Sequence, residues 1–246
     1  MEKNLNSFIS TLKPQEVTLV AGVPGSGKTS LELSVAVQCA MREKKKVVIF
    51  SIEMLSKHII QWLLCQYAEV NFKKMVNGEF SKDDWEKITA ASAALLQNNI
   101  FIDDSSRITP ADIFLKCQDL EKTLGKIDLI IIDYFQLIFY DVKKYTSRKE
   151  ENLALFKELK QVAAELNVPI LLASQINPRL GVRESCERWL PEEIQPLWIL
   201  YGNNPVGENP PDYDSSKARL EAVRGKNVGK VIPLTFDSKI LQFWET

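Results

Sequence analysis

The most informative part of this sequence is Gly22-Val23-Pro24-Gly25-Ser26-Gly27-Lys28-Thr29. Four residues separate Gly22 from Gly27, and Lys and Thr follow, which is the spacing of a phosphate-binding loop. The glycines allow the backbone to turn around phosphates with its N–H groups pointing inward. Lys28 would reach the β- and γ-phosphates of a nucleotide, and the Thr29 hydroxyl would bind Mg²⁺. The predicted nucleotide-binding residues are Gly22, Val23, Pro24, Gly25, Ser26, Gly27, Lys28, Thr29 and Ser30.

The segments on either side of this loop agree with phosphate binding. Val17–Ala21 is a short apolar run typical of a strand, and Leu31–Val37 has the composition of a helix. The amino end of such a helix carries the positive end of its dipole, which attracts anions. The other interpretation is a glycine-rich turn with a surface lysine, and the flanking strand and helix favour the nucleotide site over it.

The composition is ordinary for a globular protein and limits the partners of this chain. Its 246 residues suffice for one large α/β domain or two small ones, and its net charge is only −1. A nucleic acid would therefore have to bind a local basic patch. No apolar run is long enough to cross a bilayer, and residues 1–6 lack the features of a signal peptide, so we expect a cytoplasmic protein with no membrane partner.

The cysteines and the single histidine exclude other classes of site. No two cysteines form a CxxC pair, so we expect buried free thiols in a reducing compartment. His58 is the only histidine, which argues against a histidine-based metal site and against a Ser-His-Asp triad. The four cysteines are Cys39, Cys65, Cys117 and Cys186.

Short apolar runs alternate with longer helical stretches as far as residue 175, and short strands dominate the remainder. This order predicts an α/β fold with a mainly parallel sheet flanked by helices and extended by antiparallel C-terminal strands. We expect a short N-terminal segment over 1–14 and one domain over 15–246, with loops at 176–196 and 202–216. Beyond the first, the predicted strands are 46–51, 99–104, 127–133, 169–175, 197–201, 218–224, 231–236 and 240–244; the main predicted helices are 55–67, 85–96, the one capped by Thr109, and 148–166.

Three polar side chains lie at predicted strand ends, where ligands of such sheets bind. Asp133 would hold Mg²⁺ beside Thr29, or would instead cap a turn. Glu53 would accept a proton from the attacking water, or would instead favour a helix amino end. Gln175 would hydrogen-bond the γ-phosphate or the water, or would only satisfy backbone groups. The carboxyl ends of parallel strands meet at one edge of the sheet, and we expect every candidate residue to lie at this carboxyl edge.

Four further stretches carry distinctive motifs, at Leu12–Val20, Phe50–Met54, Ile132–Leu137 and Leu166–Gln175. They include Asp-Tyr-Phe-Gln-Leu, and Asn-Val-Pro followed by Ser-Gln. In order and spacing these stretches resemble the C-terminal ATPase domain of DnaB-type replicative helicases. The resemblance implies a RecA-like P-loop NTPase core that forms a six-membered ring on single-stranded DNA, with ATP and Mg²⁺ between subunits. The resemblance also implies the phosphate-binding, metal-binding and catalytic roles given above for Lys28, Thr29, Glu53, Asp133 and Gln175.

The chain departs from the family pattern in three places. About a dozen residues precede the first strand, where the family has a further domain and a linker helix. Arg179, Arg183 and Arg188, with Pro191-Glu192-Glu193, match the family's arginine-rich loop and acidic block only loosely. Near the C-terminus the family has Lys-x-Arg, and this chain has Arg224-Gly225-Lys226.

The exchanged pair still offers positive charge, although lysine lacks the bidentate fork of arginine. We predict that Arg224 and Lys226 act catalytically on the ATP of a neighbouring subunit. The other interpretation is a solvated hairpin with surface charges.

DNA contacts are predicted in the segments that follow Asp133 and Gln175. Basic residues with interleaved tyrosines suit sequence-tolerant binding of single strands, although a charge run can also be a solvated face. The candidate residues are Lys143, Lys144, Arg148, Lys149, Tyr140 and Tyr145.

These observations lead to three functional hypotheses. The first is an ATP-driven motor that moves along single-stranded DNA and unwinds duplex DNA, with a helicase loader or a primase as a further partner. The second is a RecA-like ATPase without helicase activity: a recombination mediator, a helicase accessory factor or a signalling ATPase ring. The third is a binding module that holds nucleotide as a structural part, which the set of Lys28, Glu53, Asp133 and Gln175 argues against.

Overall fold

The computed structural model describes residues 3–97, 99–139, 145–177, 182–202 and 216–246. Within these ranges, nine strands form one sheet in the order β3-β2-β4-β5-β1-β6-β7-β8-β9. The strands are β1 Val17–Gly22, β2 Val47–Ser51, β3 Ile100–Asp103, β4 Leu129–Asp133, β5 Ile170–Gln175, β6 Leu197–Tyr201, β7 Lys217–Arg224, β8 Val231–Asp237 and β9 Gln242–Glu245. The helices are α1 Asn6–Ile9, α2 Lys28–Ala36, η1 Val37–Arg42, α3 Ser56–Ala68, α4 Phe72–Asn77, α5 Lys82–Leu95, α6 Pro110–Leu124, η2 Phe135–Leu137, α7 Arg148–Leu166 and α8 Val182–Trp189.

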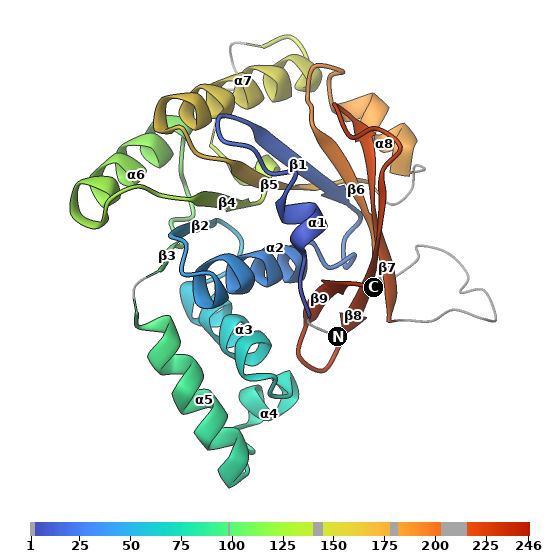
Figure 1. Cartoon of the computed structure of the whole chain (residues 1–246). Helices are drawn as coiled ribbons and strands as arrows, with labels where there is room; N and C mark the ends of the chain where they lie inside the picture. The colour runs from blue at the N-terminus through green and yellow to red at the C-terminus, as the bar shows by residue number, and fades with distance from the viewer. Residues whose placement is uncertain (1–2, 98, 140–144, 178–181, 203–215) are drawn as a thin grey trace, which may run out of the picture.

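The sheet is covered by helices on both faces (Figure 1). Alternate residues of each strand point to opposite faces, so the central strands supply two separate cores. Ile130 and Ile132 of β4 pack with α6 and α7, whereas Leu129 and Ile131 pack with α2 and α3. This explains why the central strands appear in the sequence as continuous apolar runs.

Local signals place two of the helices as predicted. Thr109 caps α6 with Pro110 at its first position, and Ser81 caps α5. In both, the hydroxyl accepts a hydrogen bond from the backbone three residues on, and an aspartate there reaches back to the cap. At the N-terminus, Leu5 and Phe8 are buried in the core that includes α2, so residues around α1 pack on the domain.

The predicted mixture of parallel and antiparallel strands is confirmed, with one change of boundary. The strands from β3 to β6 pair in parallel, and the antiparallel part begins at β7. The last two strands form the predicted hairpin, in which the Asp237 side chain accepts a hydrogen bond from the Lys239 backbone at 2.8 Å.

The expectation of a loop throughout 176–196 was wrong, because α8 lies within it. Its flanking Pro and Gly residues and its charges indicated a loop, but Cys186 on this helix and Leu190 just after it are buried in the core beneath α7. The segment is therefore helical because one face of α8 is buried against the domain. The charge content of the sequence does not reveal this burial.

All four cysteines are free and buried, as predicted. Burial raises the pKa of the Cys39, Cys65 and Cys117 thiols to about 12, and that of Cys186 to about 11, so they are unreactive at neutral pH. In the described part of the chain, every helix is too short or too polar to span a bilayer.

Candidate nucleotide-binding site

The loop at 22–29 connects the central strand β1 to α2, which begins at Lys28. Gly25 and Gly27 have φ angles of 75° and 95°, a region that residues with a Cβ rarely occupy. A Cβ on Gly27 would also lie 2.8 Å from the ring of Phe243, which is buried on β9. The glycine is therefore required both by the backbone conformation and by the strand that packs against the loop.

The C-terminal strand holds the loop helix through hydrogen bonds as well. The backbone N–H of Phe243 donates to Ser34 Oγ at 3.0 Å, and Ser34 Oγ donates to Ser30 O at 2.7 Å. Gln66 Nε2 on α3 donates to Leu241 O at 2.6 Å and to Ser30 O at 3.3 Å. The first turns of α2 are thus supported by β9 and α3, which fixes the loop that precedes them.

The Lys28 ammonium is folded back onto the loop. Its Nζ donates to the carbonyl oxygens of Gly22 at 2.9 Å and of Val23 at 3.0 Å. Burial lowers the pKa of Lys28, and the negative charge of Asp133 opposes that shift. The amine therefore lies inside the loop, where it would meet a bound phosphate chain.

Thr29 and Asp133 come together as the sequence predicts. Thr29 Oγ1 donates to Asp133 Oδ2 at 2.6 Å, across the gap between α2 and the end of β4. Burial raises the pKa of Asp133, and the Thr29 hydrogen bond offsets part of this shift. A hydroxyl and one carboxylate at this spacing suit Mg²⁺, which takes oxygen ligands and is bound by few protein groups together with substrate phosphates. The residues present therefore fit the predicted metal.

Strand register brings Glu53 and Gln175 to the same edge. Ser51 is level with Asp133, and Glu53 follows two residues later with an exposed side chain whose charge raises the pKa of Asp133. Gly22 is level with Gln175, which is also exposed. The carboxyl edge thus gathers the loop, Asp133, Glu53 and Gln175.

Gln136 is a site residue to which sequence reasoning gave no role. Its Nε2 donates to Ser174 Oγ and to Gln175 O, both at 2.9 Å, and its Oε1 accepts from the Gln175 backbone N–H at 3.2 Å. It therefore holds the backbone of Gln175. Its place in the Asp-Tyr-Phe-Gln-Leu motif was the signal that could have found it.

Glu32 is a second residue without an assigned role, one helical turn after Lys28. Its side chain is 1% exposed, and neither oxygen has a hydrogen-bond partner among the described residues. Burial raises the pKa of Glu32 well above its ordinary value; the charge of Asp133 adds to the shift, and the charge of Lys28 opposes it only in part. The sequence does not distinguish a buried acid within a helix from an acid that faces solvent.

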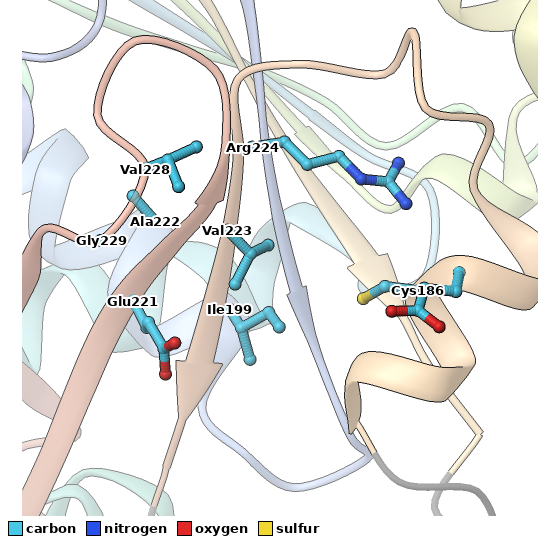
Figure 2. Close-up of a pocket in the computed structure, with 9 residues that line it drawn as sticks. Cys186, Ile199, Glu221, Ala222, Val223, Arg224, Val228 and Gly229 are labelled. Atoms are coloured by element: carbon cyan, nitrogen blue, oxygen red, sulfur yellow. The ribbon is translucent and has the colours of Figure 1, made fainter.

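Arg224 and Lys226 do not share the carboxyl edge, so the expectation of one common edge was wrong for this pair. β7 is antiparallel, and Arg224 is level with Leu197, the first residue of β6. Arg224 Nη1 donates to the carbonyls of Leu190 at 3.2 Å and Pro191 at 2.5 Å, whereas the Lys226 side chain is 94% exposed. Figure 2 shows Arg224 extending from β7 beside a pocket of about 220 Å³ that α8 and β6 also line.

The predicted DNA contacts are described only in part. Tyr140, Lys143, Lys144 and Arg179 lie outside the described residues. At the start of α7, Arg148 Nη1 donates to both oxygens of Glu151 at 2.7 Å, and the neighbouring Lys149 Nζ donates to Glu187 O at 3.3 Å. These two cations therefore have contacts within the chain.

The phosphate-binding loop follows β1, the central strand of a mainly parallel sheet. Asp133 ends β4, which is separated from β1 by one strand, and contacts the loop residue Thr29. This arrangement defines a RecA-like P-loop fold. The chain belongs to the family of the DnaB-like helicase C-terminal domain, whose family model matches residues 2–188.

Named relatives and solved structures agree with this assignment. The chain is 32% identical over 180 residues to the replicative DNA helicase DnaB of Geobacillus stearothermophilus and to the replicative DNA helicase DnaC of Bacillus subtilis (strain 168). Each match covers 73% of this chain and 39% of the relative. The chain therefore matches well under half the length of these relatives.

The solved structures share the fold at lower identity. One is a DnaB-like replicative helicase described with its interactions with primase; it has a TM-score of 0.82 at 22% identity over 95% of this chain and 58% of that chain. Another, the structure of an ATPase domain, has a TM-score of 0.79 at 21% identity, over 95% of this chain and 86% of that chain.

Proposed function

We propose that this chain is an ATP-hydrolysing motor that moves along single-stranded DNA in the cytoplasm and unwinds duplex DNA during replication. The observation that carries the proposal is the hydrogen bond of 2.6 Å between Thr29 and Asp133, next to the buried Lys28. This arrangement brings the loop hydroxyl, the strand-end acid and the loop lysine to one place, and P-loop ATPases need all three.

Each residue at the carboxyl edge has a different proposed role in ATP hydrolysis. The backbone N–H groups of the loop and Lys28 bind the phosphates, and Thr29 and Asp133 would hold Mg²⁺, which neutralises charge on the phosphates when bound. Glu53 is exposed next to this pair and would take the proton of the attacking water. Gln175 would contact the γ-phosphate or the water, on a backbone held by Gln136.

The site is completed by a second copy of the chain. Arg224 and Lys226 lie away from their own Lys28, so their charge would serve the nucleotide of a neighbour in a ring, which we propose is a hexamer. A contact between different faces of identical chains forms a ring when the rotation from one copy to the next closes. Single-stranded DNA, and a primase or a helicase loader, are the further proposed partners.

Particle size and ATP turnover, measured together with and without single-stranded DNA, test this function. We expect DNA to raise turnover in a particle of about six chains, and Glu53→Gln to abolish turnover while ATP still binds. A strand-displacement assay separates the motor from the alternative: DNA-stimulated turnover without unwinding would support a RecA-like ATPase that is not a helicase. Unchanged turnover in Glu53→Gln would contradict both.

A further inference from the structure

The turn that carries Glu53 follows β2, which lies between β3 and β4 in the sheet. The Ile52 backbone N–H donates to Asp133 O at 2.9 Å, which ties the turn to the end of β4. Within the turn, the buried Ser51 hydroxyl donates to Met54 O at 2.7 Å. These contacts fix the part of the turn next to β2, and its other end is the start of α3.

Asp104 supplies a hydrogen bond that the start of α3 lacks locally. The residue before the helix is Leu55, whose apolar side chain makes no capping hydrogen bond. Instead, Asp104 Oδ2 accepts a hydrogen bond from the Ser56 backbone N–H at 2.8 Å. The first N–H groups of a helix have no partner within the helix, and an acid near them also favours the positive end of its dipole. Asp104 therefore caps α3 from the end of a different strand, β3.

The two adjacent acids at the end of β3 have separate partners. Asp103 is level with Phe50 of β2 and contacts the Lys116 ammonium of α6. Asp104 points elsewhere, because successive residues of an extended chain face opposite sides. The hydrogen bond from the Ser56 backbone holds the pKa of Asp104 below its ordinary value, so the cap is a carboxylate at neutral pH. Of the two acids, Asp104 is the one tied to the segment that carries Glu53.

We propose that Asp104 is a positioning residue for Glu53. Its cap fixes the start of α3 three residues after Glu53, while the contacts of Ser51 and Ile52 fix the turn from the other side. The proposal rests on the proposed function, because Glu53 is the group that would take the proton of the attacking water. Asp104 acts through Glu53 and takes no part in binding ATP. A shift of about 1 Å in a catalytic group can cost roughly 100-fold in rate, so a turn held at both ends matters for catalysis.

Replacing Asp104 with Ala tests this role. We expect kcat to fall about tenfold, because Glu53 loses part of its fixed position. The KM for ATP and the equilibrium affinity for ATP should stay close to wild type, because the phosphate-binding loop is untouched. Asp104→Asn should retain most of the turnover, since its side-chain oxygen can still accept from Ser56. Turnover over a range of ATP concentrations and equilibrium binding of ATP measure these effects.

A relocated cap separates positioning from the stability of the fold. Asp104→Ala should lower the free energy of unfolding through loss of the cap, and a merely structural role would produce that loss alone. Leu55 is 54% exposed, and its φ of −66° and ψ of 145° are those of a residue that can cap a helix. Leu55→Ser in the Asp104→Ala protein places a local cap on α3, and should restore turnover together with stability.

Asp103→Asn is the matched control, because Asp103 ends the same strand but contacts α6. It should keep the wild-type kcat. The proposal would be overturned by an unchanged kcat in Asp104→Ala, or by an Asp104→Asn protein that is as slow as Asp104→Ala. Lost ATP affinity at a normal kcat would assign Asp104 to nucleotide binding instead.

Two further outcomes contradict different statements. If Leu55→Ser restores the stability of the Asp104→Ala protein but leaves its turnover low, the cap of α3 does not position Glu53 and the proposal fails while the proposed function stands. A wild-type protein that hydrolyses no ATP would overturn the proposed function, and this proposal with it.

Discussion

Arg224 and Lys28 lie toward opposite edges of the same sheet. Arg224 is level with Leu197, which pairs with Leu19 in the middle of β1, and Lys28 follows the loop beyond Gly22 at the end of that strand. The three residues from Leu19 to Gly22 separate the two levels by about 10 Å along the strand. The Arg224 guanidinium also binds the carbonyls that precede β6, away from the loop. Arg224 therefore lies away from the phosphate-binding loop of its own copy.

Replacing Arg224 or Lys226 with Ala should lower ATP turnover roughly 100-fold, because each removes positive charge from the developing charge on the phosphates. Nucleotide affinity should remain nearly unchanged, since both residues are remote from their own loop. Steady-state turnover and equilibrium binding of ATP measure the two effects. Lys230→Ala on the same hairpin is the matched control; lost binding with normal turnover per bound ATP would contradict the assignment.

Replacing Asp133 with Asn should raise the Mg²⁺ concentration needed for half-maximal turnover by about tenfold, because the charged metal ligand is lost while its shape is kept. Titrating Mg²⁺ at saturating ATP measures this. Asp128→Asn, at the other end of the same segment, is the control and should need no more Mg²⁺ than wild type. An equal Mg²⁺ requirement in both variants would rule out Asp133 as a metal ligand.

We predict that Glu32 makes the folding stability of this protein depend on pH. Its folded-state pKa is raised above the unfolded value, so the native state binds its proton more tightly than the unfolded state does. Its contribution to the free energy of unfolding therefore falls as pH rises from the unfolded pKa toward the folded pKa, by about 1.4 kcal/mol for each pH unit in that interval. Glu32→Gln removes this loss, so its stability relative to wild type should increase over that pH range.

Denaturant unfolding of the two proteins at a series of pH values measures this difference. The slope with pH carries the prediction, because the constant cost of burying an amide does not affect it. Glu158→Gln on the exposed face of α7 is the control. A difference that stays flat above pH 4 would show that Glu32 is ionised as easily in the folded protein as in the unfolded one.

Gly27→Ala should reduce both stability and ATP affinity, because it combines an unfavourable φ with the clash against Phe243. Gly78→Ala provides the comparison: its φ is 71°, but a Cβ there meets nothing within 4 Å. We expect about 1 kcal/mol of destabilisation from conformation alone at Gly78 and clearly more at Gly27. Denaturant unfolding measures the stability of both variants, and ATP titration measures their affinity for ATP. Equal losses of stability would mean that the Phe243 ring moves aside without lowering the free energy of unfolding.

Much of this site is predictable because its signals are local. The loop has a fixed spacing, and Asp133 and Gln175 end apolar runs whose length defines buried strands. Caps such as Thr109 and Ser81 place helices within a residue or two. Residues such as Gln136 and Glu32 were not predictable, since their significance lies in the partners that they gain, or lack, after folding.

From the sequence alone we could predict a phosphate-binding loop, a metal-binding pair and the parallel strands that bring them to one edge of the sheet. The folded chain separates the candidate residues into two groups, because Arg224 and Lys226 lie away from the carboxyl edge. The direction of β7 moves Arg224 away from Lys28, and the burial of α8 beneath α7 gives Arg224 its carbonyl partners. The physical reason is that motif spacing is set along the chain, whereas strand direction and helix burial depend on pairing between residues far apart in it.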